Sequence, residues 1–220
     1  AFWGDTCPAG FAEVVDLFQV KQVAPARGQW TYQTPIIDWL ARDAREPFFL
    51  LVHEMDLYDP QPPVPEADLH RYVASRDDCT APGRNPEQSL HELIPALGLP
   101  EASEHLIAHY DGAVTYYDGV VAAILEQLRT SGLSERPVVM VMSDHGNDLL
   151  EHGTMGHGTT FDSVIRVPLI VIDPALPTGG LQIDRTVQTV DIAPTILDRA
   201  GLPIAHEMTG SSLLPLLGLR

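Results

Sequence analysis

The sequence of 220 residues has few cysteines, few basic residues and no long apolar run. Its two cysteines, Cys7 and Cys79, lie far apart, which excludes a disulfide-dense scaffold and a zinc motif with paired cysteine spacing. No segment approaches the roughly 18 consecutive apolar residues of a membrane span, and the start lacks the basic and apolar stretches of a signal peptide. We therefore expect no membrane span, and the sequence leaves the compartment undetermined.

Basic residues are outnumbered by acidic ones, because 13 Lys and Arg stand against 30 Asp and Glu and leave a formal charge of -17. A field of that sign repels phosphate backbones, so we expect no nucleic-acid partner. It would also slow an anionic substrate, and an enzyme acting on one would need local positive charge, for instance from a bound cation. Solubility is the simpler explanation for most of the acidic residues.

The length of the chain suffices for one domain with a substantial core, and hydrophobic residues make up an ordinary 45%. Three short apolar runs, at residues 48–52, 138–142 and 167–172, are typical of buried strands. Each run follows or precedes a helical pattern. This alternation predicts an α/β fold with a mainly parallel sheet and helices on both faces.

The clearest helical pattern predicts a long helix that begins near Ser103, a candidate N-cap, and ends at Gly132. Its apolar stripe consists of Ile107, Tyr110, Val114, Tyr117, Val121, Ile124 and Leu128. We interpret this stripe as core-facing and assign it no chemistry. Shorter helices are expected at residues 36–44 and from Asp191 or Pro194 to Ala200.

Residues 59–100 interrupt these patterns with many prolines and little periodicity. The segment is predicted to be a long excursion over the surface. Loops of that length are uncommon unless they cap a site, so a role as a lid or in specificity is our hypothesis.

The main chemical signal is the sequence SDHG at residues 143–146, directly after the second apolar run. The carboxyl ends of strands in open α/β sheets bind ligands, and Asp144 and His145 there offer an oxygen and a nitrogen ligand to a metal ion. Adjacent residues on a strand point to opposite faces, so both reach one ion only if the backbone turns, which Gly146 and Asn147 favour. A turn-capping Asp beside a surface His is the alternative.

Two more histidines follow in the same loop. Glycines flank His157, so the backbone there can approach a ligand closely, and an imidazole can donate to an anionic oxygen or act as a general acid. His152, in the sequence EHG, is expected to be structural and hydrogen-bonded within the loop. We therefore take His157 as the candidate catalytic and substrate-binding residue.

Seven segments, in this order, together resemble the sulfatase family of the alkaline phosphatase superfamily. They are PFF at 47–49 with Asp56, YDG at 117–119, SDHG at 143–146, EHG at 151–153, IRVPLI at 165–170, DIAPT at 191–195 and TGSSLLPLL at 209–217. The likeness covers most of the chain beyond Pro47, and the combination is far more specific than any single segment.

The resemblance implies an alkaline-phosphatase-like fold and hydrolysis of sulfuric esters, either small molecules or carbohydrates. It also implies one divalent cation, with calcium as first choice and magnesium or manganese as alternatives, and a formylglycine nucleophile made from Cys or Ser. Asp144 and His145 match the family's second pair of metal-binding positions. His157 matches the position, usually Lys or His, that contacts the sulfate and assists the leaving group.

The sequence also departs from the family pattern. The residues after Cys7 do not fit the nucleophile signature, and the opening strand with two metal-binding aspartates is absent. Residues 1–220 are therefore expected to be one partial domain, the later part of the family's domain, which a missing N-terminal segment or a partner chain would complete. Tyr58 stands where the family commonly has a sulfate-contacting His, and its phenol can still donate a hydrogen bond to the substrate.

Two further interpretations stay open. The same Asp-His pair suits a phosphate or phosphonate ester hydrolase, or a phosphoglycerol transferase, of the same superfamily. A catalytically inactive remnant that serves as a binding module would also explain the absent nucleophile and Tyr58.

Overall fold

The chain forms two compact units in the computed structural model. The described residues are 2–3, 33–42, 44, 48–52, 66–69, 71–72, 98–133, 137–177 and 180–219. The first unit combines Ala1–Ser134 with Asn147–Val164, and the second combines Glu135–Gly146 with Ile165–Arg220. We describe each unit by itself, and the prediction of a single domain over residues 1–220 stays a prediction.

Several sequence predictions fall outside the described residues. Cys7, Cys79 and Tyr58 are among them. Most of the predicted excursion at residues 59–100 also lies outside, and its described part includes the short helix α3 (Glu66–Leu69).

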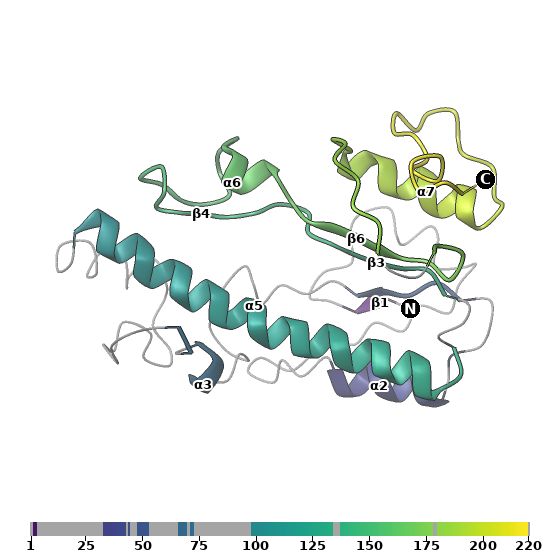
Figure 1. The fold of residues 1–220 in the computed structure, drawn as a ribbon, viewed down its shortest axis with the longest axis horizontal. Coiled ribbons are helices and arrows are strands. Elements are labelled where there is room, and N and C mark those ends of the chain that lie inside the picture. Colours follow the sequence, from purple (N-terminus) through teal and green to yellow (C-terminus); the bar gives the residue numbers. More distant parts are fainter. Residues whose placement is uncertain are drawn as a thin grey trace. The chain divides into compact units, whose positions relative to one another are not determined.

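The long helix α5 (Leu99–Thr130) organises the first unit, and α2 (Gln33–Arg42) and α3 both pack against it (Figure 1). On α2, Ile36 and Leu40 are 0% and 2% exposed. Residues four positions apart share one face of a helix, so this face supplies the buried contact of α2. The helix predicted at residues 36–44 is thus present, with its start three residues earlier.

The predicted stripe on α5 is confirmed only in part. Tyr117 and Leu128 are buried, but Val114 is 42% exposed. Its neighbour Ala113 is fully buried instead and forms the core cluster of the helix with Tyr117 and Val120. Alanine adds little to a hydrophobic pattern, yet its small side chain lets neighbouring elements approach closely. A prediction based on the spacing of bulky apolar residues therefore did not include this position.

The predicted start of α5 is wrong by about one turn. The helix begins at Leu99, and Pro100 lies in the first turn, where its missing amide hydrogen is not needed. Ser103 is therefore no N-cap, and its hydroxyl donates to the carbonyl oxygen of Leu149 at 2.7 Å. The predicted end is confirmed, because α5 ends at Thr130 and Gly132 follows with a φ of 69°, which favours glycine.

Two small sheets belong to the first unit. Strands β1 (Phe2–Trp3) and β2 (Leu51–Val52) pair in parallel, and β4 (Asp148–Leu149) and β5 (Met155–Gly156) form an antiparallel hairpin. Strand β4 contacts α5. The hairpin is therefore anchored to the longest helix of its unit.

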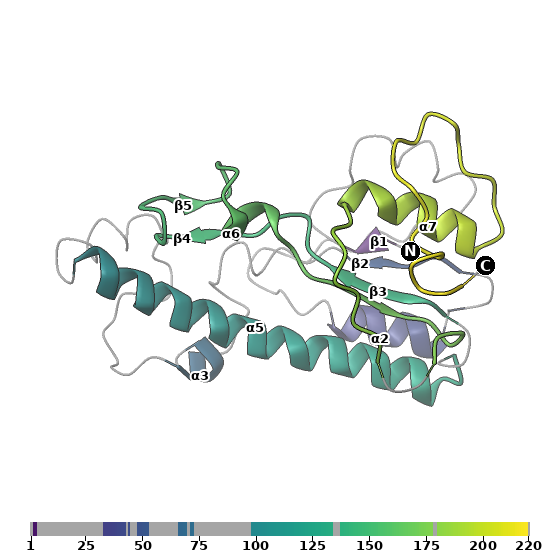
Figure 2. The same ribbon diagram turned by 45° about the horizontal axis from the view of Figure 1, so that its top comes forward.

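The second unit contains an antiparallel pair of strands (Figure 1) and a helix that is seen at full length in Figure 2. Strand β3 (Val139–Met142) pairs with β6 (Leu169–Ile172), and the 3-10 turn η1 (Thr189–Asp191) leads into α7 (Ile192–Arg199). The strands fall in the second and third predicted apolar runs, and α7 confirms the predicted last helix. The short helix α6 (Asp162–Ile165) spans the boundary between the units.

The predicted mainly parallel sheet is not confirmed. Of the strand pairs among the described residues, β1–β2 is parallel, whereas β3–β6 and β4–β5 are antiparallel. Short apolar runs indicate buried strands but carry no information on strand direction, since that depends on the connections between them. In the described part of the chain, no helix has both the length and the apolar character that crossing a membrane requires.

Polar contacts, one of them buried, join separate segments of the second unit. The fully buried Thr195 donates to the carbonyl oxygen of Asp191 and accepts from the amide of Leu213 at 2.9 Å. The Asp191 carboxylate accepts from the amides of Ser211 and Gln188, and these bonds lower its pKa. The segments DIAPT and TGSSLLPLL are thus joined directly.

Candidate metal and ester-binding site

The residues after β3 bend the chain at Asp144 and make hydrogen bonds to their own near neighbours. The carboxylate of Asp144 accepts from the backbone amide of His145 at 2.8 Å, and the hydroxyl of Ser143 donates to the carbonyl oxygen of His145. Short polar side chains make such local bonds where a strand ends. The backbone bends at Asp144, whereas Gly146 and Asn147 do not form the predicted turn, and the two adjacent side chains still approach each other.

The donor atoms of Asp144 and His145 fit one cation. Atom Nε2 of His145 lies 3.8 Å from Oδ2 of Asp144, and its Nδ1 lies 3.0 Å from the carbonyl oxygen of Gly146. With the proton on Nδ1, the ring donates to that carbonyl and presents the lone pair of Nε2, as metal-binding histidines commonly do. Two donors at this separation can both lie about 2.1–2.5 Å from one divalent ion.

The pair supplies only part of a coordination shell. Within the described ranges, no three side chains of His, Cys, Asp or Glu are grouped so that they could hold a metal ion. Calcium takes about six to eight ligands, so water, a substrate oxygen or further residues would have to complete the shell. Asp144 is 70% exposed at its side chain, which makes it accessible to an ion from solvent.

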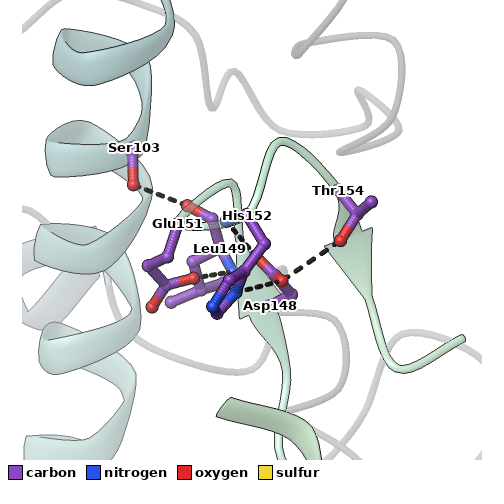
Figure 3. Close-up of polar contacts among 6 residues, drawn as sticks. All are labelled: Ser103, Asp148, Leu149, Glu151, His152 and Thr154. Atoms are coloured by element: carbon purple, nitrogen blue, oxygen red, sulfur yellow. Dashed lines mark hydrogen bonds and ion pairs between the residues drawn. The ribbon is translucent and has the colours of Figure 1, made fainter. Parts of the chain in front are cut away.

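A network around Asp148 shapes the β4–β5 hairpin (Figure 3). The carboxylate of Asp148 is fully buried and accepts from Nδ1 of His152 at 2.8 Å, from the amide of His152 at 3.3 Å and from the hydroxyl of Thr154 at 3.1 Å. Burial opposes ionisation of Asp148, but these hydrogen bonds outweigh it and lower its pKa. The predicted hydrogen bond of His152 within the loop is thus present.

The backbone of the hairpin turn is also specialised. Leu150 has a φ of 72°, a left-handed conformation that a branched side chain rarely adopts, and Gly153 has a φ of 74°. The carboxylate of Glu151 accepts from the amide of Leu149 inside the same turn. Several local bonds therefore hold a conformation that the chain would not prefer by itself.

His157 follows β5 directly. It is exposed and lies between Gly156, which has a φ of 91°, and Gly158. The structure thus brings Asp144 and His145 together in the second unit and places His157 after the hairpin of the first. Tyr58, the remaining predicted site residue, lies outside the described residues.

Sequence reasoning missed Asp148 as part of the site region. The available signal was an aspartate four residues before His152 and six before Thr154 within one loop. That spacing suits a carboxylate that closes a turn by accepting from both residues. No part of the family resemblance drew attention to it.

Comparison with known proteins identifies the family. Residues 31–202 match the sulfatase family. Arylsulfatase K of Danio rerio is 32% identical over 117 residues, which are 53% of this chain and 22% of that protein. The crystal structure of the phosphonate monoester hydrolase of Agrobacterium radiobacter has a TM-score of 0.66 at 27% identity, covering 86% of this chain and 42% of that one. A putative sulfatase from Bacteroides fragilis has a TM-score of 0.64 at 20% identity, covering 84% and 40%.

The family match and the likeness to these structures indicate an alkaline-phosphatase-like fold. This chain belongs to the sulfatase family, since the matched segment contains well over half of its residues. The predicted resemblance is thereby confirmed. The part aligned with the Danio rerio protein spans about a fifth of that protein, 22%.

Proposed function

We propose that this chain is part of an enzyme that hydrolyses sulfuric esters of small molecules or carbohydrates with the help of one divalent cation. Asp144 and His145 bind the cation, and His157 contacts the sulfate and donates a proton to the leaving oxygen. Tyr58 adds a hydrogen bond to the substrate. The proposal rests mainly on the two donor atoms that lie 3.8 Å apart after β3, in a chain of the sulfatase family.

The charge of the protein supports a cation at this place. A formal charge of -17 disfavours a sulfate ester unless positive charge is available locally. A divalent ion at Asp144 and His145 would supply it and would stabilise the negative charge that develops on the sulfate oxygens. Calcium is our first choice, with magnesium and manganese as alternatives, because oxygen and nitrogen donors suit these ions.

The position of His157 supports its role as a proton donor. An imidazole exchanges protons in the physiological range and is the commonest general acid in enzymes. Flanking glycines carry no side chain that would keep a substrate away from the ring. A donor in this position would protonate the ester oxygen as its bond to sulfur breaks.

A second candidate function is hydrolysis of phosphonate or phosphate esters. The likeness to the Agrobacterium radiobacter phosphonate monoester hydrolase, at a TM-score of 0.66, favours it. The same cation ligands and proton donor would serve either ester. Discrimination between the two therefore has to come from turnover rather than from these residues.

The test uses the protein as its gene encodes it, with whatever segments accompany these residues. Turnover of 4-nitrophenyl sulfate and of a 4-nitrophenyl phosphonate ester is compared after chelation and after return of calcium, magnesium or manganese. We expect sulfate turnover that chelation abolishes and calcium restores. Preference for the phosphonate ester would support the second candidate, and absence of all turnover would favour an inactive, binding form of the fold.

The variant Asp144→Ala tests the cation site directly. We expect a loss of turnover and a loss of calcium binding in titration calorimetry, because removal of a charged ligand leaves His145 as the single described donor of the pair. Asp184→Ala, at an exposed aspartate of the same unit, is the matched control and should retain both. Unchanged calcium affinity in Asp144→Ala would remove this residue from the proposal.

A further inference from the structure

The segment that carries His157, residues 156–161, is linked at both of its ends to the same pair of bonded residues, Asp148 and His152. At its start, Gly156 pairs with Asp148 across the hairpin. At its end, the ring of Phe161 stacks on the ring of His152, with centroids 4.0 Å apart and planes 10° apart. Since His152 is itself bonded to the Asp148 carboxylate at 2.8 Å, both ends of the segment are tied to one anchor.

Asp148, to which both ends of this segment are linked, is itself held by further contacts. Asp148 is fully buried, and its carboxylate accepts hydrogen bonds from both sides of the hairpin turn, through His152 and Thr154. The next residue, Leu149, accepts from the Ser103 hydroxyl on α5 at 2.7 Å (Figure 3). A displacement of the anchor would therefore break several bonds at once.

The chain after His157 adds little rigidity of its own. Gly156 is paired within the hairpin, but Gly158 has the widest conformational freedom of any residue type, so the chain after the imidazole adds little restraint of its own. A proton donor must stay within about 0.5 Å of its productive position. The contacts at the two ends of the segment restrain where His157 lies.

We propose that Asp148 and His152 are positioning residues that hold His157 in place for the reaction. Neither touches the substrate; they act through the hairpin at one end of the segment and through the Phe161 stack at the other. The inference rests on the proposed role of His157 in ester hydrolysis. It adds residues to which neither the family match nor the resemblance assigns a role.

The central experiment is a double-mutant cycle in the full protein. Asp148→Asn keeps the shape of the side chain, but the amide has one oxygen and so cannot accept at both carboxylate positions. In the unaltered protein, Oδ2 accepts from Nδ1 of His152 and from Thr154, and Oδ1 accepts from the backbone amide of His152. We expect kcat to fall by about 100-fold with little change in KM, as for an active group misplaced by about 1 Å. In a His157→Ala background, the same change should alter kcat by less than about threefold.

Two further variants guard against a folding defect. Thr154→Val removes one donor to the carboxylate, and Phe161→Leu removes the ring stack while leaving the carboxylate untouched. Each should lower kcat by about 3- to 10-fold, again only when His157 is present. Asp173→Asn, at a buried carboxylate of the second unit, is the matched control, and its kcat per folded molecule should equal that of the unaltered protein.

A second readout does not depend on activity. Amide hydrogen exchange of the peptide covering residues 156–161 should be faster in Asp148→Asn than in the unaltered protein, and unchanged in the Asp173→Asn control. Equal losses of kcat with and without His157 would overturn the positioning role. If the unaltered protein hydrolyses no ester, the proposed function fails, and unchanged exchange in Asp148→Asn would then separately overturn the anchor.

Discussion

Replacement of Arg199 by Ala is expected to destabilise the second unit. The guanidinium of Arg199, on the last turn of α7, makes two hydrogen bonds to the carboxylate of Asp173, which follows β6, one of them at 2.9 Å. The Asp173 side chain is 1% exposed and that of Arg199 is 35% exposed. The variant would leave a buried carboxylate with the amide of Ala175 as its remaining described partner.

The magnitude follows from the burial of the two partners. Removal of one member of a fully buried ion pair costs about 3–5 kcal/mol. Since about a third of the Arg199 side chain is exposed, solvent screens part of this interaction, and we expect a loss of about 2–3 kcal/mol. Arg199→Lys should recover only part of it, because an ammonium cannot make the two parallel bonds of a guanidinium.

The pH dependence should change sign. Hydrogen bonds from Arg199 are the largest cause that lowers the pKa of Asp173, so stability from this carboxylate is present above its ordinary pKa of 3.8 and is lost as pH falls through the lowered value. Without Arg199, burial becomes the largest effect and raises that pKa. The variant should therefore gain stability as pH falls from neutral toward the ordinary pKa.

The assay is native-state hydrogen exchange of peptides from α7, followed between about pH 3 and pH 7. All three tryptophans, Trp3, Trp30 and Trp39, belong to the first unit, so their fluorescence reports on that unit in the same samples. Arg129→Ala removes an exposed pair with the same two-bond geometry and should have a far smaller effect. A loss as small as that control, or an unaltered pH slope, would refute the reasoning.

Three further predictions concern packing. Thr195→Val should cost about 1–3 kcal/mol, because it leaves the buried amide of Leu213 without its acceptor, and exchange of the residue 211–217 peptide measures this. Gly210→Ala should cost about 3 kcal/mol by urea titration, since its Cβ would lie 2.0 Å from the carbonyl oxygen of Val190. By contrast, the Cβ of Gly119→Ala on α5 meets nothing within 4 Å, and this variant should be more stable by about 0.5–1 kcal/mol. Ile36→Ala should cost about 2–5 kcal/mol, read from tryptophan fluorescence, and a loss under 1 kcal/mol would contradict the packing of α2 on α5.

The elements of the fold were predictable to different degrees. The helix that ends before Gly132 and the strand before Asp144 follow from local patterns, because apolar spacing and turn residues act over a few positions. The start of α5 was not predictable in this way. The helix begins at Leu99 with Pro100 in its first turn, and the hydroxyl of Ser103, a residue type typical of N-caps, bonds instead to a hairpin residue 46 positions away.

The sequence by itself determined the adjacency of Asp144 and His145, the glycines around His157, and the order in which the segments that resemble the family follow one another. These properties are covalent or local, so no tertiary contact is needed to read them. Only the tertiary structure decided that Asp148 is buried and anchors a hairpin, that β3 and β6 run antiparallel, and that Asp173 meets Arg199 across 26 residues. Burial, strand direction and pairing between distant residues depend on how segments far apart in the sequence pack against one another, and local sequence patterns do not specify this packing.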